Sequence, residues 1–132
     1  MPSVVVCDQG HGGFSCREAA ILLAKSGSLG SCQRKGCGAR RRYLLTQEYP
    51  GKGSAKFELE RVVRLYTDEE AAGEGYDPML FLLRRQVADE CRIWLFYWTL
   101  NRHGAWHVGQ FPPLLSLDEF RRLNDALLSE WR

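Results

Sequence analysis

The chain has 132 residues and a formal net charge of +2, and 45% of its residues are hydrophobic while 26% are charged. These proportions are ordinary for a globular protein, so the sequence excludes a long disordered chain. No apolar run approaches the roughly 20 residues of a membrane-spanning helix, so we expect no membrane partner. At this length we expect one domain, or one small module joined to one modest domain.

The amino terminus and the cysteine count predict a compartment. The first four residues, Met1-Pro2-Ser3-Val4, contain neither a basic segment nor the start of a long apolar one, so a signal peptide is not indicated. Five cysteines are an odd number, which disfavours a disulfide framework. We therefore expect the reducing cytoplasm.

The first part of the chain alternates strand and helix signals. Residues 4–6 are β-branched and predict a short strand. Ser15 and Glu18 form a capping box that opens a helix, and Gly27 ends this helix. Residues 40–47 predict the next strand.

A domain boundary is predicted after that strand. The run Pro-Gly-Lys-Gly at residues 50–53 is the strongest turn signal in the chain. We therefore expect one unit over residues 1–50 and a second over residues 54–132. Residues 55–66 fit both a strand and a helix, and the glycine-rich turn before them favours the strand.

The second unit reads as a sheet followed by a helix. Thr67 and Glu70 predict a capped helical turn. Residues 79–83 predict a strand, and residues 91–100 predict a strand that is rich in aromatic side chains. A four-residue turn then leads to a partner strand over residues 105–111.

A third capping box predicts a C-terminal helix. Ser116 and Glu119 are spaced as the two members of such a box. Apolar residues then recur at helical spacing, which gives the helix one apolar face. The residues of this face are Phe120, Leu123, Leu127 and Trp131.

Four of the five cysteines lie within residues 7–37. Cys32 and Cys37 are separated by four residues, and glycines flank the second cysteine, which suits a tight turn that points both thiols at one ion. Zinc prefers four tetrahedral ligands drawn from cysteine and histidine. The predicted cofactor is therefore zinc, and the candidate ligands are Cys7, His11, Cys16, Cys32 and Cys37.

Five candidates for four positions leave the ligand set open. Cys16 ranks with Cys32 and Cys37, because it falls in the first turn of the predicted helix, where the helix dipole favours a thiolate. Cys7 ranks above His11, because the apolar run before Cys7 predicts a strand that ends at a ligand. The fifth cysteine, Cys91, lies far along the chain and is expected to be a buried structural thiol.

Two other interpretations of the cysteines remain open. Unpaired cysteines are often small buried side chains without a chemical role. A redox or catalytic cysteine is the second alternative, because a glycine-rich loop and a helix follow Cys7. Cysteine phosphatases, however, carry an arginine where this chain has Gly13. No nucleophile–base or acid–base pair at a diagnostic spacing is visible, so an enzyme ranks third among the functions.

Charge is distributed unevenly along the chain. Residues 1–53 contain eight basic and three acidic residues, whereas residues 54–132 contain ten basic and thirteen acidic residues. A basic segment suggests a polyanion such as DNA or RNA as partner. The alternative is that basic side chains offset the negative charge of a metal–thiolate site. The residues expected to meet phosphates are Arg34, Lys35, Arg40, Arg41 and Arg42.

Aromatic residues alternate along residues 91–100. Trp94, Phe96 and Trp98 share one face of the predicted strand, because successive side chains point to opposite faces. If this face is open, Trp94 and Trp98 are expected to stack on unpaired bases. If it is closed, they belong to the core, and we favour the core.

Two segments resemble known families. Residues 31–45, Ser-Cys-Gln-Arg-Lys-Gly-Cys-Gly-Ala-Arg-Arg-Arg-Tyr-Leu-Leu, resemble the second knuckle of zinc-ribbon proteins, which commonly serve transcription and RNA processing. Residues 91–128 resemble in pattern the single-strand-binding fold of the transcriptional coactivator called positive cofactor four, an antiparallel sheet with a C-terminal helix. The wide spacing of Cys7 and Cys16 and the helix between the ligand pairs depart from the usual ribbon.

The predicted fold class is α+β, with a small zinc-ribbon-like module followed by an antiparallel β-sheet packed by a C-terminal helix. The first functional hypothesis is a small intracellular zinc-binding protein that contacts DNA or RNA, as part of transcription or processing machinery. The alternative is a protein–protein adaptor or homodimer in which zinc is purely structural.

Overall fold

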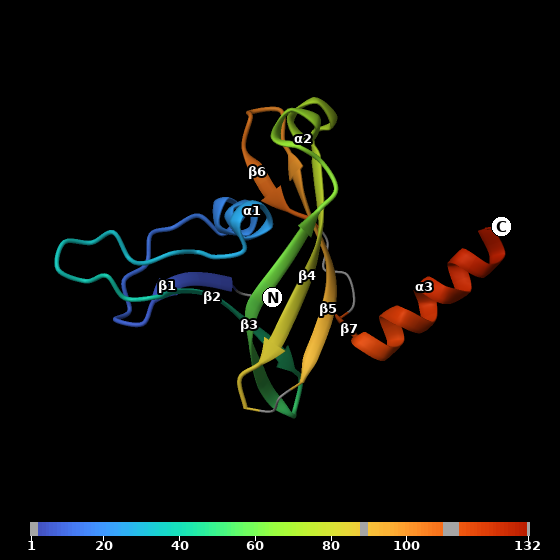
Figure 1. Ribbon diagram of the computed structural model, residues 1–132, viewed down its shortest axis with the longest axis horizontal. Coiled ribbons are helices and arrows are strands. Elements are labelled where there is room, and N and C mark those ends of the chain that lie inside the picture. The colour runs from blue at the N-terminus through green and yellow to red at the C-terminus, as the bar shows by residue number, and fades with distance from the viewer. Residues whose placement is uncertain (1–2, 88–89, 110–113, 132) are drawn as a thin grey trace.

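Figure 1 shows the computed structural model, which describes residues 3–87, 90–109 and 114–131. Side chains at positions 114, 115, 123, 126–128, 130 and 131 are not described. Within these limits the chain forms seven strands and three helices. In chain order they are β1 (Ser3–Cys7), α1 (Cys16–Ser26), β2 (Arg41–Tyr49), β3 (Gly53–Arg64), α2 (Asp68–Glu74), β4 (Tyr76–Arg85), β5 (Cys91–Leu100), β6 (Trp106–Val108), β7 (Leu114–Ser116) and α3 (Leu117–Trp131).

The seven described strands form one antiparallel sheet. Strands β1 to β6 are neighbours in the order of the sequence, and β7 pairs with β5. The segment 50–53, predicted as a boundary, forms the turn between β2 and β3, where the Lys52 amide donates to the Tyr49 carbonyl at 2.9 Å. The sheet therefore runs without interruption from the predicted unit 1–50 into the predicted unit 54–132.

Several sequence predictions of local structure are confirmed. Of the strand preferred for residues 55–66, residues 55–64 lie in β3, and the predicted aromatic strand is β5. Of the predicted strand 105–111, β6 covers Trp106–Val108, and residues 110 and 111 lie outside the described residues. The Ser15 hydroxyl accepts from the Glu18 amide at 3.3 Å, which caps the N-terminus of α1. Gly27 ends α1 with a φ of 74°, a left-handed conformation that glycine adopts without strain.

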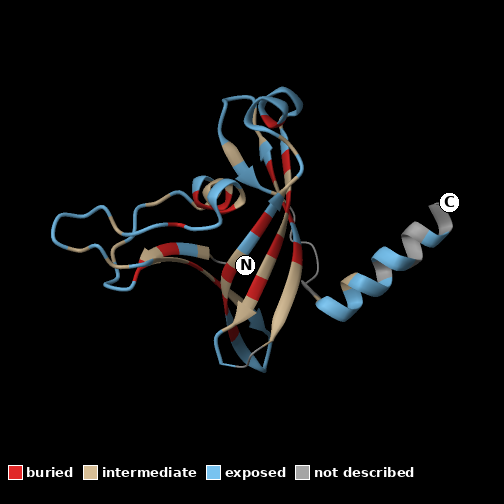
Figure 2. Ribbon diagram, viewed as in Figure 1, coloured by how far each residue is buried: buried red, intermediate tan, exposed pale blue. Residues whose placement is uncertain are grey.

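Helix α1 packs against the concave face of the curled sheet. A β-bulge between Leu59 and Arg61 shifts the register of β3 against β4, and bulges increase the local twist of a sheet. Helix α1 packs against β3 and contributes the small residues Ala19 and Ala20, together with Leu23, to the core. Figure 2 shows the buried positions alternating along the strands and lining one side of α1. The core of the protein therefore lies between α1 and the sheet.

The C-terminal helix does not cover the sheet as predicted. The capping box that starts α3 is confirmed, since the Glu119 amide donates to the Ser116 hydroxyl at 3.1 Å. Figure 1 shows α3 leaving the sheet on the side opposite α1, and its contacts are with β7 and β5. Helix α3 follows β7 without a linker and points away from both faces of the sheet. The predicted face positions Leu123, Leu127 and Trp131 lie outside the described side chains.

The prediction that Trp94 and Trp98 stack on bases is also corrected. Their side chains are 1% and 3% exposed, and both belong to the core beneath α1. Phe81 and Phe96 stack with ring centroids 4.7 Å apart, and Trp94 meets Phe96 edge-on at 4.6 Å. A base cannot reach these rings without opening the core, so the alternative interpretation as core residues holds.

A buried ion network joins α1 to the sheet. Asp77 of β4 is fully buried, and its carboxylate accepts hydrogen bonds from Arg64 at 2.9 and 3.0 Å and from Arg17 at 2.9 Å. The guanidinium of Arg17 also lies 3.8 Å from the centroid of the Trp106 ring. Asp77 therefore links α1, β3 and β4 at one end of the core.

Candidate metal centre

The first metal-binding arm is the turn that follows β1. Cys7 is the last residue of β1 and is 3% exposed. The chain turns back at once, since the Gly10 amide donates to the Cys7 carbonyl at 2.8 Å and the Cys7 amide donates to the His11 carbonyl at 3.0 Å. Gly10 has a φ of 85°, which side chains other than glycine rarely tolerate. This turn places His11 beside the thiol of Cys7.

The second arm is a narrow loop between α1 and β2. The Cys32 amide donates to the Ala39 carbonyl at 2.7 Å, and the Cys37 amide donates to the Arg34 carbonyl at 3.0 Å. Gly36 has a φ of 80°, so the turn before Cys37 uses the conformation that the glycine pattern predicted. Both thiols of this arm are half-buried.

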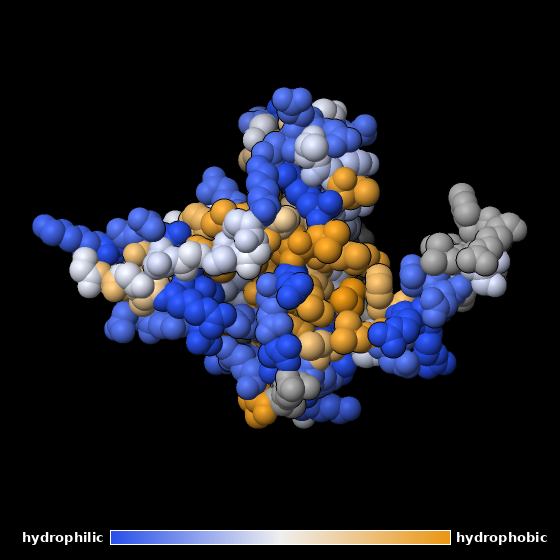
Figure 3. Space-filling view, viewed as in Figure 1, coloured by the Kyte–Doolittle hydropathy of each residue, from blue (hydrophilic) through white to orange (hydrophobic). Residues whose placement is uncertain are grey.

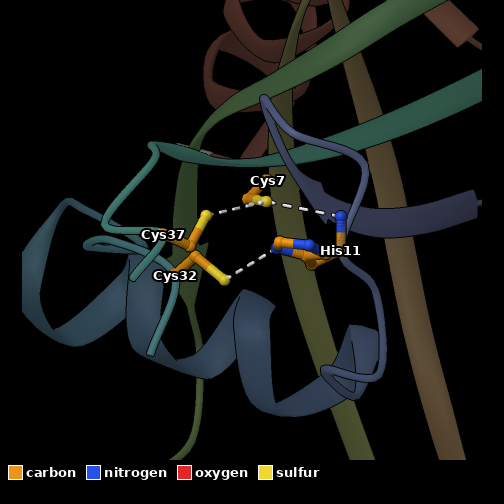
Figure 4. Close-up of side chains that lie close together, drawn as sticks. All are labelled: Cys7, His11, Cys32 and Cys37. Carbon is orange, nitrogen blue, oxygen red and sulfur yellow. Dashed lines mark hydrogen bonds between the residues drawn. The ribbon is translucent and has the colours of Figure 1, made fainter. Parts of the chain in front are cut away.

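The two arms bring Cys7, His11, Cys32 and Cys37, here called the Cys3His cluster, to one point (Figure 4). The four ligand atoms all lie within 4.8 Å of one another. The Sγ atoms of Cys7 and Cys37 are 3.8 Å apart, and Sγ of Cys32 is 3.6 Å from Nδ1 of His11. A tetrahedral zinc ion with ordinary bond lengths separates two sulfurs by about 3.8 Å and a sulfur from a nitrogen by about 3.5 Å. The cluster therefore has the dimensions of a four-coordinate metal site.

Electrostatics at the cluster also suit a cation. Burial raises the pKa of the Cys7 thiol, but backbone hydrogen bonds from His11 and Gln9 outweigh burial and bring that pKa below its ordinary value. A backbone hydrogen bond at Ala39 lowers the pKa of Cys37, but burial and the neighbouring thiols raise it above its ordinary value overall. Three thiols this close cannot all ionise in isolation, and a divalent cation removes that repulsion.

The structure separates Cys16 from the other candidate ligands. Cys16 is the first residue of α1, and its Sγ accepts from the Ser3 hydroxyl at 3.6 Å, outside the cluster. Its place in the cluster is taken by His11, which ranked last in sequence. The chain between His11 and α1 forms neither helix nor strand, and it carries Cys16 away from the turn at Cys7. The signal that favours His11 is its spacing of three residues from Cys7, which matches a close ligand pair.

Replacement of Cys16 by alanine is expected to leave zinc binding unchanged, because its thiol does not point at the cluster. Metal content after dialysis, measured by elemental mass spectrometry, checks this expectation. Replacement of Cys32 by alanine serves as the matched control and is expected to lose the metal. If the Cys16 variant loses the metal as the Cys32 variant does, Cys16 is a ligand.

The predicted phosphate-binding residues divide into two groups. Arg42 pairs with Asp8 at 2.8 Å, and both Arg40 and Arg42 lie 3.5 Å from Glu58. The guanidinium of Arg41 lies 4.6 Å from the centroid of the Phe14 ring. Arg34 and Lys35 are exposed in the turn before Cys37, and no ion pair joins either of them to another residue in the described parts of the chain. Three of the five basic residues are thus already engaged within the protein.

Comparison of this chain with protein-family models, with curated proteins and with solved structures gave no match. Among the described residues, no helix has both the length and the apolar character needed to span a membrane. Cys91 lies on β5, away from the cluster.

Proposed function

We propose that this protein is a zinc-stabilised interaction module, in which zinc is structural and the sheet presents the binding surface. The observation that supports zinc is the Cys3His cluster, whose ligand atoms have tetrahedral spacing. Four protein ligands complete the coordination of zinc and leave no open position for a substrate. The metal is therefore assigned a structural role rather than a catalytic one. Five free thiols and a zinc–thiolate site are suited to a reducing compartment such as the cytoplasm.

The need for a metal follows from the lack of buried side chains in the two arms. No side chain is buried between residues 8 and 15 or between residues 30 and 40. These segments therefore lack a hydrophobic core of their own, and zinc replaces it by joining the end of β1 to the loop before β2. Zinc sites of this kind supply folding free energy directly.

Cobalt(II) substitution tests the proposed ligand set. Cobalt takes the tetrahedral position of zinc, and three thiolates with one imidazole give strong visible absorption together with sulfur-to-cobalt charge-transfer bands. The wild-type chain is expected to show these bands with one equivalent of cobalt, and zinc is expected to abolish them. His11→Ala is expected to change the visible bands while keeping the charge-transfer bands. Octahedral, weakly absorbing cobalt in the wild type would contradict the proposal.

Protein binding is preferred to nucleic-acid binding, because the arginines make contacts within the chain and the exposed face of the sheet is apolar. Arg40, Arg41 and Arg42 make contacts within the chain, and the aromatic face of β5 is buried. The opposite face of the sheet exposes large apolar side chains, including Val63 at 65% and Leu95 at 50%. Exposed apolar patches mark protein-binding surfaces more often than phosphate-binding ones.

Nucleic-acid contact is a second candidate function, favoured by Arg34 and Lys35 alone. Both side chains are exposed at the tip of the second arm. In this case the double substitution Arg34→Glu with Lys35→Glu is expected to weaken binding to many sequences alike, and to flatten the salt dependence by up to about one unit per lost contact. Fluorescence anisotropy with single- and double-stranded oligonucleotides over a salt series measures both effects. Charge reversal at Arg121 and Arg122 of α3 provides the control, and equal losses in both variants would dismiss a specific role of the turn.

A further inference from the structure

The outer face of the sheet is unusually apolar for a surface in contact with water. We use the name outer sheet face for Val63, Leu65, Pro78, Leu80, Ile93 and Leu95, which lie on β3, β4 and β5 or directly beside them. Val63 pairs with Leu80, and Leu80 pairs with Leu95, so apolar side chains form a row across three strands. Figure 3 shows apolar surface gathered over the middle of the molecule, between α1 and the start of α3.

The outer sheet face is also hollowed. Val63, Leu65, Pro78, Leu80 and Leu95 line an open depression of about 330 Å³. Leu65 is 69% exposed there. A depression with mainly apolar walls accepts a large apolar side chain from a partner, because removing apolar surface from water stabilises a complex.

Helix α3 is a second element with an apolar face in its sequence pattern, and it projects from the body of the protein (Figure 1). Its sequence repeats apolar residues at helical spacing, and Leu117 is 43% exposed at its start. Within the described residues its main contacts are with β7 and β5. Helices of about this length are marginal in water unless an apolar face is packed against another surface.

Helix α3 points away from its own sheet (Figure 1). Strand β7 ends at Ser116 and α3 begins at Leu117, so no linker separates them. The Ser116 amide donates to the Glu119 carboxylate at 3.0 Å, and this reciprocal capping box closes the first turn of α3 directly at the end of β7. The α3 helix of a second copy of the chain, by contrast, can lie on the outer sheet face of the first copy.

The dimensions of the two elements match. Three neighbouring strands span about 10 Å, which is close to the diameter of one helix with its side chains. Fifteen residues of helix extend for about 22 Å, enough to follow the apolar row and the hollow beside it. The outer sheet face therefore has the width of a site for a single helix.

We propose that two copies of this chain form a symmetric dimer in which α3 of each copy lies on the outer sheet face of the other. This proposal rests on the proposed interaction function and names the partner. A two-fold axis makes the exchange reciprocal, so both unpartnered apolar elements are covered twice in one closed assembly. Two helix-on-sheet contacts suit the standard size of a stable interface.

Sedimentation velocity of the zinc-loaded chain tests the proposal. The wild type is expected to sediment as a dimer at micromolar concentration. Leu95→Glu on the outer sheet face and Phe120→Glu on α3 are each expected to lose the dimer. Val87→Glu is the matched control, because Val87 is 92% exposed and lies outside both elements, and it is expected to remain dimeric.

Mixing the two monomeric variants gives the decisive outcome. A mixed dimer contains one intact contact, between α3 of the Leu95→Glu chain and the sheet of the Phe120→Glu chain, so mixing is expected to restore part of the dimer. A monomeric wild type, or a Phe120→Glu variant that stays dimeric, would overturn the exchange of helices. Zinc content is measured in every sample, so a wild-type chain that is monomeric with one zinc bound refutes this inference without affecting the metal site.

Discussion

Replacing Cys37 by serine is expected to abolish zinc binding and to unfold both metal-binding arms. Cys37 supplies one of the four ligand atoms, and its Sγ lies 3.8 Å from that of Cys7. Structural zinc contributes about 10–16 kcal/mol of apparent binding free energy in small zinc-dependent folds, and most of this is lost when a ligand is removed. Residues 8–15 and 30–40 have no buried side chains to compensate, whereas the core between α1 and the sheet contains no residue of these two segments.

Amide hydrogen exchange measures this effect segment by segment. Protection is expected to disappear between residues 8 and 15 and between residues 30 and 40, while β4 and β5 remain protected. Cys91→Ser provides the control, since Cys91 lies on β5 and is expected to keep one zinc and full protection of the arms. Unchanged protection of the arms in the Cys37 variant would mean that the metal does not hold them.

Replacing Asp77 by alanine is expected to destabilise the protein by about 3–5 kcal/mol. The change removes the buried carboxylate and leaves the Arg64 side chain, which is 7% exposed, with the more exposed Asp68 as its remaining acidic partner. It also frees Arg17, which holds the start of α1 against the sheet. Removing one partner of a buried ion pair lowers the free energy of unfolding by more than the intact pair contributes to it, because the remaining charge stays desolvated.

Urea unfolding at saturating zinc measures the free energy of unfolding for this variant. Asp118→Ala is the matched control, since Asp118 is 74% exposed and pairs with Arg122 at 3.6 Å on the surface of α3. That change is expected to cost about 1 kcal/mol or less. An Asp77 variant as stable as the control would show that the buried network does not hold α1 in place.

Local structure was predictable from the sequence where a short-range rule decides it. The caps of α1, the capping box of α2 and the alternation along β5 depend on residues within four positions of one another, and the structure confirms them. The placement of α3, by contrast, depends on how the whole chain is arranged and not on residues close together in the sequence. The sequence pattern gives α3 an apolar face but not the direction in which the helix leaves β7, and Figure 1 shows that α3 points away from the sheet instead of covering it.

The candidate metal site also combines features that neighbouring residues decide with features that the whole fold decides. The turn that presents Cys32 and Cys37 follows from the glycines around them, and it was predicted. The choice between Cys16 and His11 depends on the direction in which the chain leaves the turn after Cys7. The helix dipole favoured Cys16, but geometry across the two arms selects His11. The strand residues Trp94 and Trp98 are core, because their rings pack against Phe81 and Phe96 on the face of the sheet that carries the buried side chains.

Native mass spectrometry of the purified chain tests the central claim most directly. The intact protein is expected to carry one zinc ion per chain, and the mass is expected to fall by that of zinc with the return of the displaced protons when the chain is denatured in acid. The thiols of Cys7, Cys32 and Cys37 should react with an alkylating reagent only after this release. A native chain that holds no metal, and whose three thiols react at once, would contradict the zinc-stabilised module.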